Sequence, residues 1–219
     1  MDLLQAADDL AVDVVIYDQQ LCSSPTSAVF IGSYERAKEF LHLCGERLDR
    51  AGMEFPLEPD QERMFILQGA RRHIQTAGGL VLSSKEPRNP WTLVLSKERS
   101  SLNGLPAQFP SLNLSARRRF LEVVVVPDAE RAVHLLKGLP QHPAFLGIDG
   151  VQSVGLAVTG PSRAGLVDRL VQAGVHRILP LGDMFMCGAV EPYDGVTMSS
   201  LFTRIVYWRD VSASLEEQP

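Results

Sequence analysis

The segment Phe120-Leu-Glu-Val-Val-Val-Val126 decides the fold of this chain. Valine is β-branched and enriched in strands, and four valines in succession leave no polar face for solvent. A strand without a polar face is buried on both sides, as strands are in the middle of a parallel or mixed sheet. The segment therefore predicts a central strand in a sheet that other elements cover.

Helices and strands alternate on both sides of this segment. Asp128 is a predicted N-cap for a helix over 129–138, and strands over 151–159 and 175–181 flank a helix over 163–173. This alternation predicts an α/β fold with helices packed on a mostly parallel sheet. Upstream, the pattern predicts helices over 3–16, 36–50 (capped by Ser33) and 60–76 (capped by Asp60), and strands over 28–31, 80–82 and 91–96.

No internal repeat or clear linker divides the chain. We therefore expect one domain over residues 1–195, followed by a C-terminal strand and tail over 196–219. Within the tail, 203–208 is a predicted strand that could pair at a sheet edge. The segment 100–115 is rich in Ser, Pro, Gly and Asn, which predicts a surface loop.

Composition excludes several classes of protein. The 219 residues carry a net charge of -5, which gives no basic surface for nucleic acid. No apolar run reaches the roughly 18 residues of a membrane span, and the N-terminus is acidic, unlike that of a signal peptide. One basic run, Arg117-Arg118-Arg119, precedes the central strand; we interpret it as a solvated strand entrance, with an anion site as the alternative.

Cysteine and histidine spacing argues against a disulfide framework and against a metal site. The three cysteines are odd in number and far apart, which fits a reducing cytoplasm. Neither the cysteines nor the histidines show the short spacing of zinc ligands, so we expect no metal. The residues concerned are Cys22, Cys44, Cys187, His42, His73, His134, His142 and His176.

The turn Tyr17-Asp-Gln-Gln-Leu-Cys-Ser-Ser-Pro25 surrounds Cys22 with small, polar and turn-forming residues. Such a turn could expose a thiol for nucleophilic attack and its backbone amides for an oxyanion. An ordinary loop cysteine is the alternative. Cys44 lies on the apolar stripe of its helix, and Cys187 follows the apolar Met184-Phe-Met186, so we expect both to pack in a core or interface.

The cysteine turn resembles the cysteine segment of the acyl-CoA reductases of bacterial bioluminescence, which belong to the aldehyde dehydrogenase superfamily. Gly174-Val-His-Arg-Ile-Leu-Pro-Leu-Gly182 and Glu191-Pro-Tyr-Asp-Gly195 resemble the final segment of the same family. Tyr193 stands where the family has a histidine. The order of elements between these motifs also matches, so the resemblance covers nearly the whole chain.

The resemblance implies a three-layer aldehyde-dehydrogenase-like catalytic domain in which Cys22 is the nucleophile. Cys22 would take an acyl group from an acyl-CoA or from an acylated partner protein, and NADPH would then release a fatty aldehyde. The backbone amide of Cys22 would help to hold the oxyanion. Glu122 would bind the cofactor ribose, with an ordinary solvent-facing or ion-paired glutamate as the alternative.

In enzymes of this superfamily the dinucleotide-binding domain, the general-base glutamate and the oxyanion asparagine lie largely before the cysteine. Only 21 residues precede Cys22, and no Gly-rich dinucleotide fingerprint is present. The resemblance therefore implies the C-terminal half of a reductase, associated with an N-terminal half. A non-catalytic remnant or subunit, and a cysteine acyltransferase or thioesterase, are the alternatives.

Three further features have expected roles. Asp18 and Gln19 could steer the cysteine turn by hydrogen-bonding backbone amides. Asp194-Gly195 predicts a turn, which the resemblance places at the edge of the active site or at an interface. The terminal strand of the superfamily often completes a sheet across a dimer, which implies a homo-oligomer formed through the C-terminal segment.

Overall fold

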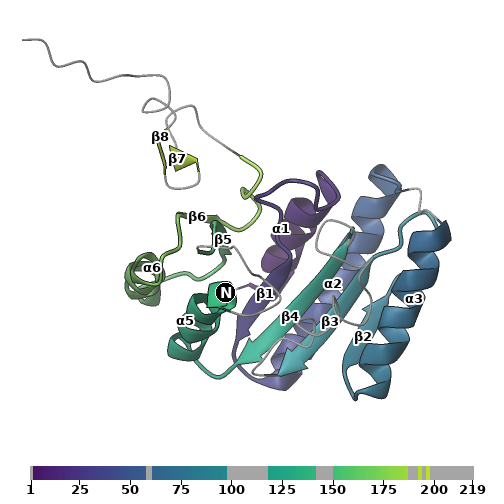
Figure 1. Cartoon of the computed structure of the whole chain (residues 1–219), viewed down its shortest axis with the longest axis horizontal. Helices are drawn as coiled ribbons and strands as arrows, with labels where there is room; N and C mark the ends of the chain where they lie inside the picture. Colours follow the sequence, from purple (N-terminus) through teal and green to yellow (C-terminus); the bar gives the residue numbers. More distant parts are fainter. Residues whose placement is uncertain are drawn as a thin grey trace, which may run out of the picture.

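The structure is a computed structural model that describes residues 2–57, 61–97, 118–141, 150–186, 192–193 and 196–197. Its main sheet has the strand order β1-β4-β3-β2, in which β1, β4 and β3 are parallel and β2 is antiparallel to β3 (Figure 1). The strands are β1 (Ser27–Ile31), β2 (Leu80–Ser83), β3 (Thr92–Lys97) and β4 (Phe120–Val126).

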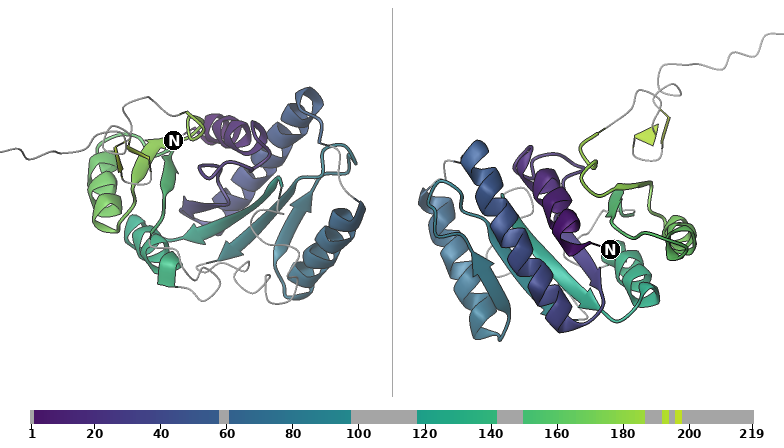
Figure 2. Two further views of the ribbon diagram at one scale, coloured as in Figure 1. Left: turned by 45° about the horizontal axis from the view of Figure 1, so that its top comes forward. Right: turned by 180° about the vertical axis from the view of Figure 1, so that it is seen from behind.

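Strand β4 is buried along its whole length and lies between β1 and β3, as the sequence predicts. Leu121, Val123 and Val125 pack on one face of the sheet against α1 (Leu3–Val15) and α2 (Tyr34–Glu54). The alternate residues of β4 pack on the opposite face, against α3 (Gln61–Thr76) and α5 (Ala129–Gly138). The sheet is thus the middle of three layers (Figure 2), which confirms the predicted α/β class.

Local capping signals set where the helices begin. The backbone N–H of Leu4 donates to the Asp2 carboxylate at 2.9 Å, and that of Arg36 donates to Ser33 Oγ at 3.3 Å. Cys44 faces the core from α2 and is 1% exposed, as predicted for a packing residue. Burial raises the pKa of the Cys44 thiol far above its ordinary range, so this thiol is unreactive.

The second half of the chain adds a smaller parallel pair, β5 (Ser153–Leu156) and β6 (Arg177–Pro180), which is separate from the main sheet. Helix α6 (Ser162–Gln172) connects the two strands, and Gly174 follows it with φ 85°, a conformation that glycine adopts without strain. Both strands are shorter than predicted. The further strands are β7 (Pro192–Tyr193) and β8 (Val196–Thr197), which pair with each other, and a 3-10 turn covers Leu139–Gln141.

Several sequence predictions lie outside the described residues. These are the cap by Asp60, the loop over 100–115, the packing of Cys187, the Asp194-Gly195 turn and the strand over 203–208. Among the described helices, none is long and apolar enough to cross a membrane.

Asp13 joins α1 to the segment after β6. Its carboxylate is 3% exposed and accepts hydrogen bonds from the backbone N–H groups of Gly182, at 2.7 Å, and Met184, at 3.0 Å. Burial raises the pKa of Asp13, although the two amides oppose the shift. The sequence pattern gives no sign of this contact, because its partners are about 170 residues away.

We expect Asp13→Asn to lower the free energy of unfolding by about 1–3 kcal/mol, because one buried backbone N–H loses its acceptor. The deficit should be largest near pH 4 and shrink as the pH rises. A raised carboxyl pKa stabilises the folded wild type fully below the unfolded pKa, and this contribution is lost as the pH rises through the folded value. Urea unfolding at several pH values measures both effects.

The matched control is Asp168→Asn, since Asp168 is exposed on α6. It should change the unfolding free energy by less than about 0.5 kcal/mol. A deficit for Asp13→Asn that grows with pH would contradict the raised pKa.

Candidate active site

Cys22 lies in the turn between α1 and β1, and its side chain is exposed, as predicted. The turn is built from consecutive tight backbone bonds, from Gln20 N–H to the carbonyl of Tyr17 at 2.9 Å and from Ser24 N–H to that of Leu21 at 3.0 Å. The C-terminal end of α1 precedes the turn. The geometry therefore presents the thiol to solvent at the amino end of the parallel strands.

Gln19 fastens both ends of the cysteine turn to the start of β4. Its side-chain amide donates to the carbonyl of Pro25 at 2.7 Å and to that of Phe120 at 3.1 Å, and its oxygen accepts from Phe120 N–H at 2.7 Å. Because Ser27 pairs with Glu122, Pro25 would oppose Phe120 if the ladder continued. The Gln19 amide thus replaces a missing strand neighbour.

Arg119 corrects the interpretation of the Arg117–Arg119 run as a solvated strand entrance. Arg119 is 0% exposed, and its guanidinium donates to Asp18 Oδ1, Asn89 Oδ1 and the carbonyl of Phe55, each at 2.6 Å. A buried cation is tolerated only when it is paired and hydrogen-bonded. We call Arg119 and its three acceptors the Arg119 network.

Helix α2 holds two members of the Arg119 network in place. The Asn89 amide group is 2% exposed and donates to the carbonyl of Leu48 at 2.9 Å, so its oxygen is turned toward Arg119. A Cβ on Gly52 would lie 1.9 Å from Asn89 Nδ2, so only glycine allows this approach. The carbonyl of Phe55 is at the C-terminal end of α2, where a cation is favoured by the helix dipole.

The role predicted for Asp18 and Gln19 is refined by these contacts. Gln19 does accept from a backbone amide, but that amide belongs to β4, whereas Asp18 accepts from the Arg119 side chain. Asp18, Gln19 and Arg119 have φ values of 49°, 58° and 49°, in the left-handed region that costs energy for side-chain-bearing residues. Their hydrogen bonds offset this cost.

Glu122 lies on β4 two residues beyond Phe120, which is roughly 7 Å along the strand. It is 1% exposed, and its carboxylate accepts a hydrogen bond from Ser96 Oγ on β3 at 2.5 Å. The carboxylate is therefore buried and hydrogen-bonded to the neighbouring strand. Its predicted contact with a cofactor ribose stays a prediction.

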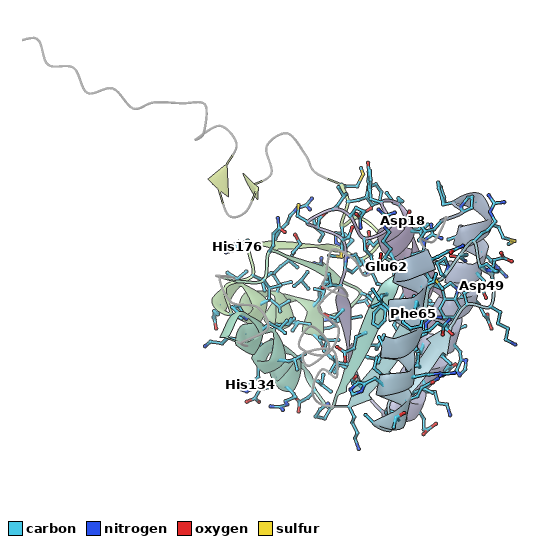
Figure 3. The ribbon with its side chains drawn as sticks, turned by 45° about the vertical axis from the view of Figure 1, so that its right-hand side comes forward. Asp18, Asp49, Glu62, Phe65, His134 and His176 are labelled. Atoms are coloured by element: carbon cyan, nitrogen blue, oxygen red, sulfur yellow. The ribbon has the colours of Figure 1, made fainter. Side chains whose placement is uncertain are left out.

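The described histidines lie on the protein surface. His42, His73, His134 and His176 are all exposed. Figure 3 places His134 and His176 on the side of α5 and β6, and Asp18 toward the end of the molecule where Glu62 lies in the first turn of α3. Within the described ranges, no three His, Cys, Asp or Glu side chains gather as metal ligands would.

The motif Gly174–Gly182 forms the turn that follows α6, strand β6 and the residues after it. Arg177 in this motif donates to the carbonyl oxygens of Met184, at 3.1 Å, and Met186. The motif thereby orders the segment whose amides contact Asp13. The side chains of Tyr193, Asp194 and Cys187 lie outside the described part of the chain.

Comparison with known proteins shows which family and which solved structures this chain is similar to. The sequence model of the acyl-CoA reductase (LuxC) family matches residues 1–205. The search of curated proteins found no match.

Three solved structures show the fold. An indole-3-acetaldehyde dehydrogenase complexed with NAD+ has a TM-score of 0.55 and 14% identity over 88% of this chain. An oxidoreductase from Marinobacter aquaeolei has a TM-score of 0.58 and 12% identity over 90%, and the aldehyde dehydrogenase KauB from Pseudomonas aeruginosa has 0.54 and 14% over 88%. This chain spans 38%, 39% and 38% of the lengths of those three proteins.

We expect Gly52→Ala to lower the free energy of unfolding by about 1–3 kcal/mol, because the added methyl group overlaps the Asn89 amide. The sign is informative, since Gly to Ala inside a helix normally stabilises by roughly 0.5–1 kcal/mol. The control is Gly165→Ala in α6, where a Cβ meets nothing within 4 Å. Urea unfolding of both variants measures the contrast, and a stabilised Gly52→Ala would contradict the close approach.

Proposed function

The chain belongs to the acyl-CoA reductase (LuxC) family, and we propose that it carries the acyl-accepting cysteine of a fatty acyl-CoA reductase. Cys22 is the nucleophile in this proposal, and the product of the complete enzyme is a fatty aldehyde. The observation that carries the proposal is the exposed Cys22 thiol in a turn tied to the sheet by Gln19 and Arg119.

The proposed first step is a thioester exchange. The Cys22 sulfur attacks the carbonyl carbon of the acyl-CoA and forms a new carbon–sulfur bond. The bond from that carbon to the CoA sulfur then breaks, and the leaving CoA thiolate takes up the proton that Cys22 released. An acylated partner protein would donate its acyl group in the same way. A backbone N–H in the turn, that of Cys22 in our proposal, stabilises the oxyanion.

The described residues do not form a complete dinucleotide site. Glu122 is buried and engaged with Ser96, and the sequence has no Gly-rich phosphate-binding fingerprint. A nicotinamide cofactor, which we propose to be NADPH, would supply the hydride that reduces the acyl group. We propose that it is held by a part of the enzyme outside these 219 residues, on the same polypeptide or on another.

Exposed apolar side chains support an association with such a part. Phe65 on α3 is 81% exposed, Met53 near the end of α2 is 78% exposed and Phe55 is 51% exposed. Such side chains would lose their contact with water if another chain covered them. We propose a homo-oligomer or a complex with a cofactor-binding half, in the cytoplasm.

A second candidate function is acyl transfer from Cys22 to water or to another nucleophile. It is favoured because the Cys22 thiol is exposed for acyl transfer, whereas Glu122, the residue expected to bind the cofactor ribose, is engaged with Ser96. A transferase or thioesterase would release an acid or an ester, whereas a reductase releases an aldehyde when NADPH and the cofactor-binding part are supplied. Product analysis separates the two functions.

We expect incubation with a long-chain acyl-CoA to add the mass of one acyl group to the chain. Cys22→Ser should abolish the rapid gain, because an alcohol is a far weaker nucleophile than a thiol at neutral pH. Intact-mass spectrometry over time is the measurement. Cys44→Ala, which removes the buried thiol, is the control and should keep the gain. An acyl group that persists in Cys22→Ser would exclude Cys22 as the acceptor.

A further inference from the structure

We propose that Arg119 is a positioning residue for the Cys22 thiol, acting through its ion pair with Asp18. This inference rests on the proposed function of Cys22 as the acyl acceptor. Arg119 itself is buried and does not reach solvent or substrate. Its effect is on where the turn holds the sulfur.

The Arg119 guanidinium is held in place by parts of the protein outside the cysteine turn. Arg119 directly precedes β4, and its backbone carbonyl accepts a hydrogen bond at 2.8 Å from the N–H of Thr92, the first residue of β3. Two of its three acceptors, Asn89 and the carbonyl of Phe55, belong to segments anchored on α2. The cation is thus held by elements that the hydrophobic core orders independently of the cysteine turn.

The third acceptor belongs to the cysteine turn and carries the only charge among the three. The Asp18 side chain is 26% exposed, whereas that of Arg119 is 0% exposed. If Asp18 swung into solvent, the buried Arg119 would lose the carboxylate with which it pairs in the described part of the chain, and the loss of that partner carries a large penalty. The penalty favours the conformation in which Asp18 stays at Arg119 and the turn stays closed.

This restraint acts on a strained part of the backbone. Asp18 and Gln19 are successive residues with positive φ, four and three positions before Cys22. Two neighbouring contacts, Asp18 to Arg119 and Gln19 to Phe120, fix the direction in which the chain leaves this bend. The direction of the bend then determines the placement of the sulfur, because only Gln20 and Leu21 intervene.

A purely structural role for Arg119 would predict a general loss of stability, whereas positioning predicts a change confined to the turn. Asp18→Asn separates them, because it removes the charge and keeps a side chain that tolerates positive φ. The matched control is Asp49→Asn, which makes the same change at a carboxylate that accepts from Trp91 Nε1 at 2.7 Å and contacts neither Arg119 nor the turn.

In Asp18→Asn we expect the rate of amide hydrogen exchange across residues 18–25 to rise about tenfold. A neutral hydrogen bond is weaker than a charge-assisted one, so the turn should open more often. Exchange in α2 and β4 should stay at the wild-type rate. Acylation of Cys22 by acyl-CoA should slow about tenfold, because that step needs an oriented sulfur, whereas alkylation by iodoacetamide should change less than about twofold. Asp49→Asn should match the wild type in the turn and in acylation.

Arg119→Lys is the second variant, since it keeps the charge and loses the guanidinium fork that reaches three acceptors. If Arg119→Lys folds, it should show the same rise in exchange over the cysteine turn as Asp18→Asn. If Arg119→Lys does not fold, the result for Asp18→Asn alone tests the positioning role. Unchanged exchange over residues 18–25, or an equal rise over α2 and β4, would overturn the inference. If wild type is not acylated, the proposed function fails, and the exchange data still test the positioning.

Discussion

One buried cation connects the central strand of this molecule to the turn that carries Cys22. The Arg119 guanidinium joins the start of the central strand to the end of α2, to the turn before β3 and to the cysteine turn. Packing alone would order the three layers, because their apolar faces are complementary. Packing does not determine the path of a polar turn at the edge of the sheet, and in this fold hydrogen bonds from Arg119 and Gln19 do so.

The position of that cation follows from the polarity of the fold. Cys22 precedes β1, so it lies at the amino end of the parallel strands, whereas ligands of open α/β sheets commonly bind at the carboxyl ends. Helices that connect parallel strands present their C-terminal ends at the amino edge, and the carbonyl of Phe55 is one such end. Partial negative charge there favours a guanidinium. Helix α1 likewise ends, and does not begin, before the cysteine turn, so its N-terminus does not face Cys22. The turn therefore depends on side chains for its order.

The sequence predicts well those elements whose signals are local. Strand β4 and helix α5 have the predicted bounds, because a run with four successive valines and an Asp cap followed by helical periodicity leave little ambiguity. The exposure of Cys22 also follows from its immediate neighbours. Strands β5 and β6 are shorter than predicted, because their parallel ladder runs only from the pair Ser153 and Arg177 to the pair Leu156 and Pro180. Apolar composition predicts where a strand can form, but pairing determines how far it extends.

The polar contacts at the site could not be predicted in this way, because each joins residues distant in sequence. Arg119 has two arginines before it, and nothing in the run distinguishes the buried side chain from the others. Its burial depends on Asn89, which depends in turn on the absence of a side chain at Gly52. One signal was present: Arg119 immediately precedes a strand that is buried from its first residue, so its own side chain begins inside the protein. A charged residue beside a fully buried strand is therefore a candidate for a paired interior position, and its partner is to be sought among polar residues in turns at the same edge of the sheet.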